Sequence, residues 1–291
     1  MKRKTTNLVE AENITRKIAS GHYENFPVGS ILIPKKSRQH FYNLYAFMRT
    51  ADDFADDQGR RVEERLRLLA DWRRQLEETF LGIEPRHPAF VALSHSIEEY
   101  QLSIDPFSRL LDAFTFDVHD SAKFSTEADL YWYTARSAAP VGELVLALFG
   151  YRDADRIQLS DDICTALQLI NFIQDAKEDL ERGRCYFPTA DLPRDRPRDP
   201  ASTLLTDHAL LRQLVQLQLS RASGLLKKGE SLPSLVTGRL RFELRAILAE
   251  AEMMIKKIER LDYDTLRGRP KLSKIEHALA LARAIFLNRR T

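Results

Sequence analysis

Apolar side chains recur along this chain at spacings of three and four residues over long segments. Such spacing puts them on one face of a helix, and no convincing run shows the alternation of a strand. Glycine (11) and proline (12) are sparse and cluster between these segments. The pattern predicts an all-α fold, a helical bundle formed as a single domain over residues 1–291.

Local signals mark two helix starts and one loop. Asp105 before Pro106 is typical of an N-cap followed by a first-turn proline, and Asp153 is a second N-cap candidate. Residues 183–200 hold four prolines among alternating Arg and Asp, which predicts a surface loop. No internal repeat of solenoid length is visible.

Composition narrows the class of protein. With 44% hydrophobic residues the chain can build a sizeable core, so disorder is not expected. Lysine plus arginine (44) nearly cancels aspartate plus glutamate (42), so a formal charge of +2 offers little attraction to nucleic acid. Cys164 and Cys185 lack the spacing of a metal knuckle or disulfide framework, which suits a reducing compartment.

The N-terminus is basic but polar residues follow it, so no secretion signal is predicted. The longest apolar stretch, residues 141–151, contains Glu143 and is far shorter than the roughly 20 residues that cross a bilayer. We therefore expect a cytoplasmic protein, either soluble or attached to the surface of a membrane.

The first candidate for chemistry is an acidic cluster, Asp52, Asp53 and Asp56. Asp52 and Asp56 are four residues apart, so they share a helix face and their carboxylates can share a ligand. The other faces of this segment are apolar, with Leu44, Phe47, Met48 and Phe54.

A second cluster repeats this arrangement with Asn171, Asp175 and Asp179 at successive spacings of four. Its neighbours are again apolar, namely Leu169, Ile170, Phe172 and Ile173. A solvated acidic face is the ordinary reading of such spacing, but these settings predict largely buried helices. Buried carboxylates repel one another unless cations compensate them, and oxygen ligands without histidine or thiolate favour Mg²⁺.

Cationic and aromatic residues lie beside both clusters. Arg49 is three residues before Asp52, where its guanidinium can pair with a carboxylate or hold a phosphate oxygen. Spacing alone does not decide between these two roles. Arg184 and Tyr186 directly follow the second cluster.

These motifs resemble those of the squalene and phytoene synthase family of head-to-head isoprenyl enzymes. The first is similar to Tyr-Ala-x-x-Arg-x-x-Asp-Asp-x-x-Asp, carried by Tyr45, Ala46, Arg49, Asp52, Asp53 and Asp56. The second is carried by Gln168, Asn171, Asp175 and Asp179, followed by Gly183, Arg184, Tyr186 and Pro188. Both occur in the family's order, and the match runs over most of the chain.

The resemblance implies helices around a central cavity, with the clusters facing each other at its mouth. It implies Mg²⁺ as cofactor and a long prenyl diphosphate as substrate, with the metal helping diphosphate to leave and an apolar pocket protecting the carbocation. The implied metal ligands are Asp52, Asp53, Asp56, Asn171, Asp175 and Asp179. The implied catalytic residues are Asp52, Asp56, Asp175, Asp179 and Tyr133. The implied substrate contacts are His22, Asn25, Phe26, Tyr45, Arg49, Ser137, Gln168, Asn171, Arg184 and Tyr186.

Several positions depart from the condensing members of the family. Asn25 stands where a diphosphate-contacting serine is usual, Gln174 stands where arginine is common, and Ser137-Ala138-Ala139-Pro140-Val141-Gly142 replaces Val-Ala-Gly-x-Val-Gly. By itself that last run also fits helix packing around a proline kink. The departures resemble the hydroxysqualene synthase branch of bacterial hopanoid pathways. That branch ionises presqualene diphosphate and lets water capture the rearranged cation.

Two alternatives stay open. One is a condensing synthase that joins two prenyl diphosphates into presqualene diphosphate, squalene, dehydrosqualene or phytoene. The other is a non-catalytic relative that serves in assembly, a role in which loss of the acids would be expected.

The poor solubility of such a substrate predicts contact with the inner face of a membrane, and pathway enzymes are possible partners. Basic residues near the C-terminus could assist membrane contact, namely Arg267, Arg269, Lys271, Arg289 and Arg290.

Overall fold

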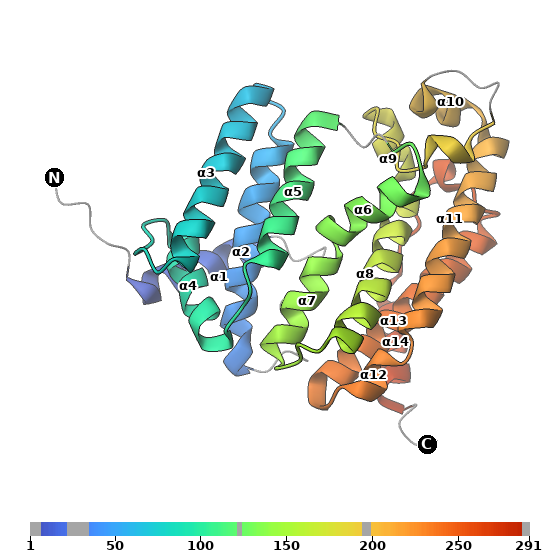
Figure 1. Cartoon of the computed structure of the whole chain (residues 1–291). Helices are drawn as coiled ribbons and strands as arrows, with labels where there is room; N and C mark the ends of the chain where they lie inside the picture. Colours follow the sequence, from blue (N-terminus) through green and yellow to red (C-terminus); the bar gives the residue numbers. More distant parts are fainter. Residues whose placement is uncertain (1–6, 22–34, 121–123, 194–198, 287–291) are drawn as a thin grey trace. The chain divides into compact units, whose positions relative to one another are not determined.

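The computed structural model describes residues 7–21, 35–120, 124–193 and 199–286. The described elements are helices, which confirms the all-α prediction (Figure 1). The chain divides into two compact units, residues 1–119 with 143–152, and residues 120–142 with 153–291. The single domain over 1–291 and its central cavity stay predictions.

The described part of the first unit contains four complete helices, a fifth that lacks only its last residue, and the end of a sixth. They are α1 (Leu8–Gly21), α2 (Lys35–Asp56), α3 (Val62–Phe80), α4 (Pro88–Tyr100), α5 (Asp105–Asp120) and the C-terminal part of α7 (Ala139–Leu148). Helix α2 packs against α1, α3 and α4, and α1 also packs against α4. The helix that carries the first acidic cluster therefore has neighbours along its length.

Aromatic rings form the core of this unit. Phe47 of α2 lies with its ring centroid 5.9 Å from Trp72 of α3, 5.8 Å from Phe90 of α4 and 5.3 Å from Phe107 of α5. All four side chains are buried. Because Phe47 precedes Asp52 by little more than one turn, this core fixes the end of α2 that carries the acids.

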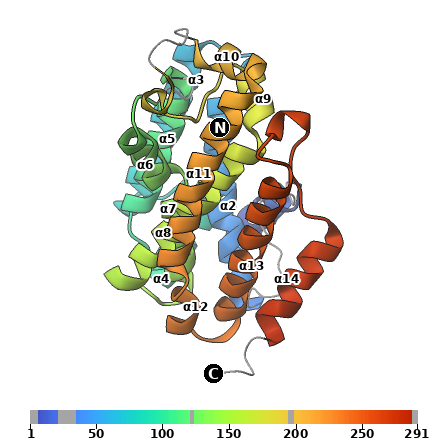
Figure 2. The ribbon, with the colours of Figure 1, turned by 90° about the vertical axis from the view of Figure 1, so that its right-hand side faces the viewer.

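The second unit is organised around α8. Its elements are α6 (Glu127–Ser137), the start of α7, α8 (Ala154–Gln174), α9 (Ala176–Glu181), η1 (Thr189–Asp191), α10 (Pro200–Thr206), α11 (His208–Gly229), α12 (Leu232–Leu235), α13 (Gly238–Arg260), η2 (Thr265–Arg267) and α14 (Lys274–Phe286). Helix α8 contacts α6, α9, α11, α12 and α13, and Figure 2 shows α14 beside α13. Gly229 lets the end of α11 approach α8, because a Cβ there would lie 2.9 Å from the Leu159 carbonyl oxygen.

The local helix signals were largely right. Asp153 is the N-cap of α8, with its side chain accepting from the Arg156 amide. Helix α5 begins at Asp105 itself rather than after it, so that prediction was wrong by one residue. Thr126 and Asp129 form a capping box at the start of α6.

The stretch predicted as a surface loop, residues 183–200, is only partly at the surface. Residues 185–188 are buried, and the Thr189 amide donates to the Phe124 carbonyl over 2.9 Å. The physical reason is that Tyr186 and Phe187 are large apolar side chains, which stabilise the unit more in its core than in water. Their burial outweighs the surface preference of the neighbouring prolines and charges.

Candidate active site

The first acidic cluster lies in the last two turns of α2. Arg49 forms ion pairs with Asp52 over 3.1 Å and with Asp53 over 2.6 Å, so within this unit its guanidinium has the first of its two predicted roles, pairing with carboxylates. The Asp52 side chain is 37% exposed and that of Asp53 is 53% exposed. These acids are thus less buried than expected, because the core face of α2 is the opposite one, which carries Phe47 and Ala51.

Three acids at this end of α2 are electrostatically unfavourable on their own. A helix C-terminus carries partial negative charge, and the last turn of α2 contains no basic residue. Arg49 lies one turn earlier and supplies one positive charge to the cluster. The arrangement therefore favours binding of further cations. Tyr45, on the same side of α2, has a raised pKa because it is partly buried.

The second cluster lies across a break between two helices. Helix α8 ends at Gln174, Asp175 is its C-cap, and α9 begins at Ala176. The Asp175 amide still donates to the Asn171 carbonyl and the Asp179 amide to the Asp175 carbonyl, each over 2.9 Å. Because this i to i+4 bonding continues through the break, Asn171, Asp175 and Asp179 keep the common stripe that their spacing predicted.

A segment that is distant in the sequence contacts this cluster. Arg269 forms an ion pair with Asp175, in which the Nη2 to Oδ2 distance is 3.2 Å. Gln174 Nε2 donates to the Pro270 carbonyl over 2.8 Å. Arg267 pairs with Asp264 over 3.0 Å. Arg267 and Arg269 were predicted to assist membrane contact, but within this unit both are engaged by aspartates.

Charge in the second cluster is only partly compensated. Burial raises the pKa of Asp175, against the lowering effect of Arg269. Burial and the neighbouring charge of Asp175 raise the pKa of Asp179 to about 6. Arg184 lowers the pKa of Asp179 somewhat, and its amide donates to the Asp179 carbonyl over 2.8 Å. This electrostatic setting suits a bound cation.

An aromatic wall adjoins the second cluster, and we use this name for Phe124, Tyr133, Phe172 and Tyr186. Phe172 and Tyr186 stack with ring centroids 3.9 Å apart and planes within 6°. Tyr133 lies 6.2 Å from each of them and 5.4 Å from Phe124. All four rings are buried. The structure thus brings together Tyr133 and Tyr186, which the sequence had placed in one site only through the family resemblance.

The small-residue run before Glu143 is a helix junction. Helix α6 ends at Ser137 and α7 begins at Ala139, with Pro140 in its first turn. A Cβ on Gly142 would lie 2.6 Å from Cys164 Sγ, so glycine is needed for close packing on α8. This observation supports the packing interpretation of the run. Ser137 Oγ is buried and has no hydrogen-bond partner among the described residues, and Gln168 is half-buried on α8.

Three of the predicted substrate contacts lie outside the described residues, namely His22, Asn25 and Phe26.

A hollow of about 310 Å³ near the end of α3 is lined by residues such as Arg74 and Arg86 and by none of the predicted site residues. Among the described residues, no helix is long and apolar enough to cross a membrane.

Sequence reasoning missed two groups of residues. Arg269 and Pro270 were assigned no role in the second cluster, because their contacts with it span 94 and 96 positions of the chain. A group of two histidines and a glutamate, His40, His95 and Glu99, was also missed. The spacing of four between His95 and Glu99 was the one signal for it, and His40 joins them only through the packing of α2 on α4.

Solved structures identify the fold. The chain superposes on a dehydrosqualene synthase with a TM-score of 0.83 over 98% of each chain, and at 23% identity this shows the fold. It superposes on the squalene synthase HpnC from Alicyclobacillus acidocaldarius with a TM-score of 0.80 and 37% identity, over 88% of this chain and 96% of that one. The architecture is therefore the isoprenoid synthase fold.

Sequence relatives identify the family. The squalene/phytoene synthase profile matches residues 19–276. A 15-cis-phytoene synthase from Synechococcus elongatus is 28% identical over 281 residues, covering 92% of this chain and 90% of the relative. A presqualene diphosphate synthase from Rhodopseudomonas palustris is 33% identical over 158 residues, covering 54% of this chain and 56% of the relative. The chain belongs to the squalene/phytoene synthase family, whose members process prenyl diphosphates.

Proposed function

We propose that this protein is a hydroxysqualene synthase, which ionises presqualene diphosphate and captures the rearranged cation with water in hopanoid biosynthesis. The observation that carries the proposal is the commitment of Gln174 to the Pro270 carbonyl. Condensing relatives commonly carry arginine at this position. Gln174 therefore supplies no positive charge for a second diphosphate, and the cation beside Asp175, Arg269, is engaged in an ion pair with that carboxylate.

The donor set fits Mg²⁺ as the cofactor. Each cluster supplies oxygen ligands, with three carboxylates in the first and two carboxylates and an amide in the second. Bound Mg²⁺ would neutralise charge that develops on the departing diphosphate. The proposed Mg²⁺ ligands are Asp52, Asp53 and Asp56 in the first unit, and Asn171, Asp175 and Asp179 in the second.

The chain's own side chains have separate roles in this reaction. Arg49 and Arg184 carry the positive charge that holds diphosphate oxygens, and Tyr45 lies on the same side of α2 as Arg49. The aromatic wall offers ring faces, which attract a carbocation, and its burial limits premature capture by water. Ser137 Oγ is a buried hydroxyl that could orient the water that ends the reaction.

Product analysis tests this proposal directly. Purified full-length protein is incubated with Mg²⁺ and presqualene diphosphate in H₂¹⁸O, and products are analysed by mass spectrometry. We expect a C30 alcohol that carries ¹⁸O. An unlabelled hydrocarbon, or no turnover of presqualene diphosphate, would contradict the proposal.

A condensing synthase is the second candidate, because relatives named presqualene diphosphate synthase and 15-cis-phytoene synthase share 33% and 28% identity with the chain. Incubation with farnesyl diphosphate or geranylgeranyl diphosphate alone separates the two. Formation of a C30 or C40 product from either would favour condensation. A non-catalytic assembly role would gain if Asp52→Asn and Asp175→Asn left the cellular phenotype intact.

We also propose that the protein works at the inner face of a membrane, since a C30 diphosphate and its alcohol product partition into lipid. Flotation with vesicles of mixed anionic and zwitterionic lipid tests this proposal. Recovery of the protein in the dense fraction, with and without substrate, would count against it.

A further inference from the structure

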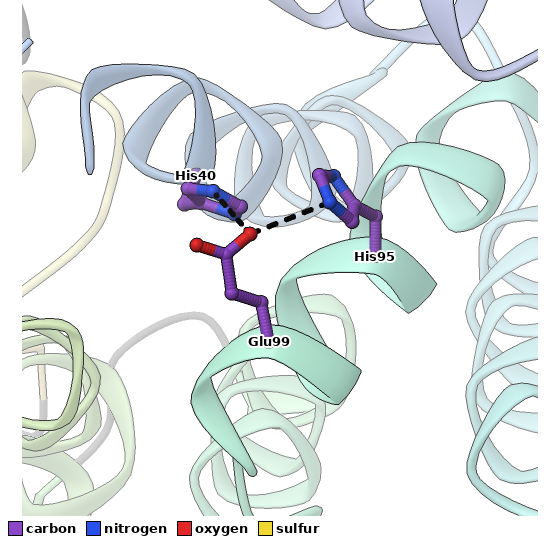
Figure 3. Close-up of side chains that lie close together, drawn as sticks. All are labelled: His40, His95 and Glu99. Carbon is purple, nitrogen blue, oxygen red and sulfur yellow. Dashed lines mark ion pairs between the residues drawn. The ribbon is translucent and has the colours of Figure 1, made fainter. Parts of the chain in front are cut away.

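Two imidazole rings converge on one carboxylate in the first unit. His40 lies on α2, and His95 and Glu99 lie one turn apart on α4 (Figure 3). Glu99 Oε2 is 3.3 Å from His40 Nε2 and 3.4 Å from His95 Nε2. One potential ligand atom from each of the three residues lies within 4.8 Å of the others.

The remaining ring nitrogens have partners of their own. His40 Nδ1 lies 3.0 Å from Ser96 Oγ, and His95 Nδ1 lies 3.2 Å from Glu12 Oε1 on α1. Histidines that bind metals typically donate their second N–H to such a hydroxyl or carboxylate, which fixes the tautomer and turns the other nitrogen toward the metal. Both rings thus have the outer contacts of metal ligands.

The number of protons around His95 is the strongest argument. Both of its ring nitrogens face carboxylate oxygens, from Glu12 and from Glu99. A neutral imidazole has one N–H, so one lone pair would point at a negatively charged oxygen. Either a second proton or a metal cation must lie between His95 and one of these carboxylates.

The surroundings of His40 favour the metal. Ser96 Oγ donates its one hydrogen to the Ala92 carbonyl over 3.4 Å, so it accepts from His40 Nδ1. The lone pair of this ring then lies on Nε2, the nitrogen that faces Glu99. The spacing fits as well. Four ligands about 2.0–2.1 Å from a tetrahedral Zn²⁺ lie about 3.3 Å from one another, close to the two distances between Glu99 and the histidines.

We propose that His40 Nε2, His95 Nε2 and the Glu99 carboxylate bind a divalent transition metal, with Zn²⁺ the best match to two imidazoles and one carboxylate. Water fills the fourth position, because Glu99 is 50% exposed and His95 is 38% exposed. The site is separate from the first acidic cluster, since Asp52 lies 12 positions after His40, roughly 18 Å along α2. Metal bound here would tie α2 to α4, with α1 joined through Glu12.

The test is Zn²⁺ binding by the full-length chain after removal of any affinity tag. Calorimetry at pH 7.5 in excess Mg²⁺ keeps the oxygen-only clusters from competing for Zn²⁺. We expect one equivalent to bind, and the tetrahedral visible absorption of Co²⁺ to appear when Co²⁺ replaces it. His95→Gln and Glu99→Gln should each weaken binding at least tenfold. Both side chains are partly exposed, so we expect the variants to fold, and circular dichroism checks this.

Two further variants sharpen this test. Glu12→Gln removes only the outer partner and should weaken binding about tenfold. His277→Gln is the matched control, because His277 is an exposed histidine 2.8 Å from Glu250 on other helices. It should bind Zn²⁺ like the wild type. The proposal is overturned if the wild type binds no Zn²⁺, or if His95→Gln and Glu99→Gln bind it as tightly as the wild type does.

Discussion

The two acidic clusters carry similar side chains but are built differently. The first is contained in one helix, with Arg49 pairing with residues three and four positions away. The second lies at a helix break and is bound by Arg269 and Pro270, which are 94 and 96 positions from their partners. The ion pairs of the first cluster therefore form within a single helix, whereas those of the second depend on the fold of its whole unit.

The two clusters also differ in how their charges affect the stability of the folded protein. Arg49 and its partners are partly exposed, so solvent screens their interaction. In the second cluster burial raises the pKa of Asp175 and Asp179, which means that burial makes their charged forms less stable than they would be in water. Raised pKa values of this kind are typical of functional sites, which agrees with the proposed role of these carboxylates in binding a metal.

The largest expected effect is loss of activity on removing one carboxylate from either cluster. Asp52→Asn and Asp175→Asn each remove one anionic ligand, and we expect kcat to fall about a thousandfold through lost stabilisation of the departing diphosphate. Steady-state rates across a Mg²⁺ titration provide the measurement. The neighbouring acids Asp57 and Glu178 supply matched controls, and Asp57→Asn and Glu178→Gln should stay within about threefold of wild type.

Much of this arrangement could be predicted from local spacing. The stripe of Asn171, Asp175 and Asp179 was predicted as one continuous helix, and it persists because backbone bonding continues through the break at Asp175. Asp153 was recognised as an N-cap because capping involves only residues three positions apart. Arg269 could not be found in this way, since a contact over 94 positions is decided by how α13 and the segment after it pack.

A second prediction concerns the loop that carries Arg269. Asp264 is 1% exposed and lies 3.1 Å from Arg212, 3.0 Å from Arg267 and 3.4 Å from His208. Asp264→Asn should lower the free energy of unfolding by roughly 2–4 kcal/mol, because two guanidinium groups and an imidazole lose their carboxylate partner. Chemical denaturation measures this, with Asp262→Asn as the control. Asp262 is 76% exposed and, among the described residues, forms an ion pair only with Arg212, so we expect a change below about 0.5 kcal/mol.

The same residue gives a pH dependence. Burial opposes charge on Asp264, but the hydrogen bonds from Arg212 and His208 prevail and lower its pKa. The folded state therefore binds a proton less readily than the unfolded state. The stabilisation is complete above the unfolded pKa of about 3.9 and is lost as the pH falls through the lower folded pKa. In Asp264→Asn the loss of stability below pH about 4 should be shallower than in the wild type, and parallel curves would contradict this account.

A smaller effect is expected from Gln174. Gln174→Leu removes a neutral hydrogen bond to the Pro270 carbonyl, which contributes about 1 kcal/mol. Hydrogen exchange should accelerate in residues 268–273, while exchange in the first unit stays unchanged. Equal protection of this segment in both proteins would show that Arg269 alone holds it.

The smallest expected change in stability is at Arg49. Its pairs with Asp52 and Asp53 are partly exposed and lie within one helix, so Arg49→Gln should alter the free energy of unfolding by less than about 0.5 kcal/mol. If the guanidinium also holds a diphosphate oxygen, KM should nevertheless rise about tenfold. Arg73→Gln removes an ion pair of similar exposure, to Asp112 over 2.7 Å, away from the acids, and serves as the control for both quantities. An unchanged KM in Arg49→Gln would restrict Arg49 to pairing with the aspartates, and the first cluster would then bind its ligands through carboxylates alone.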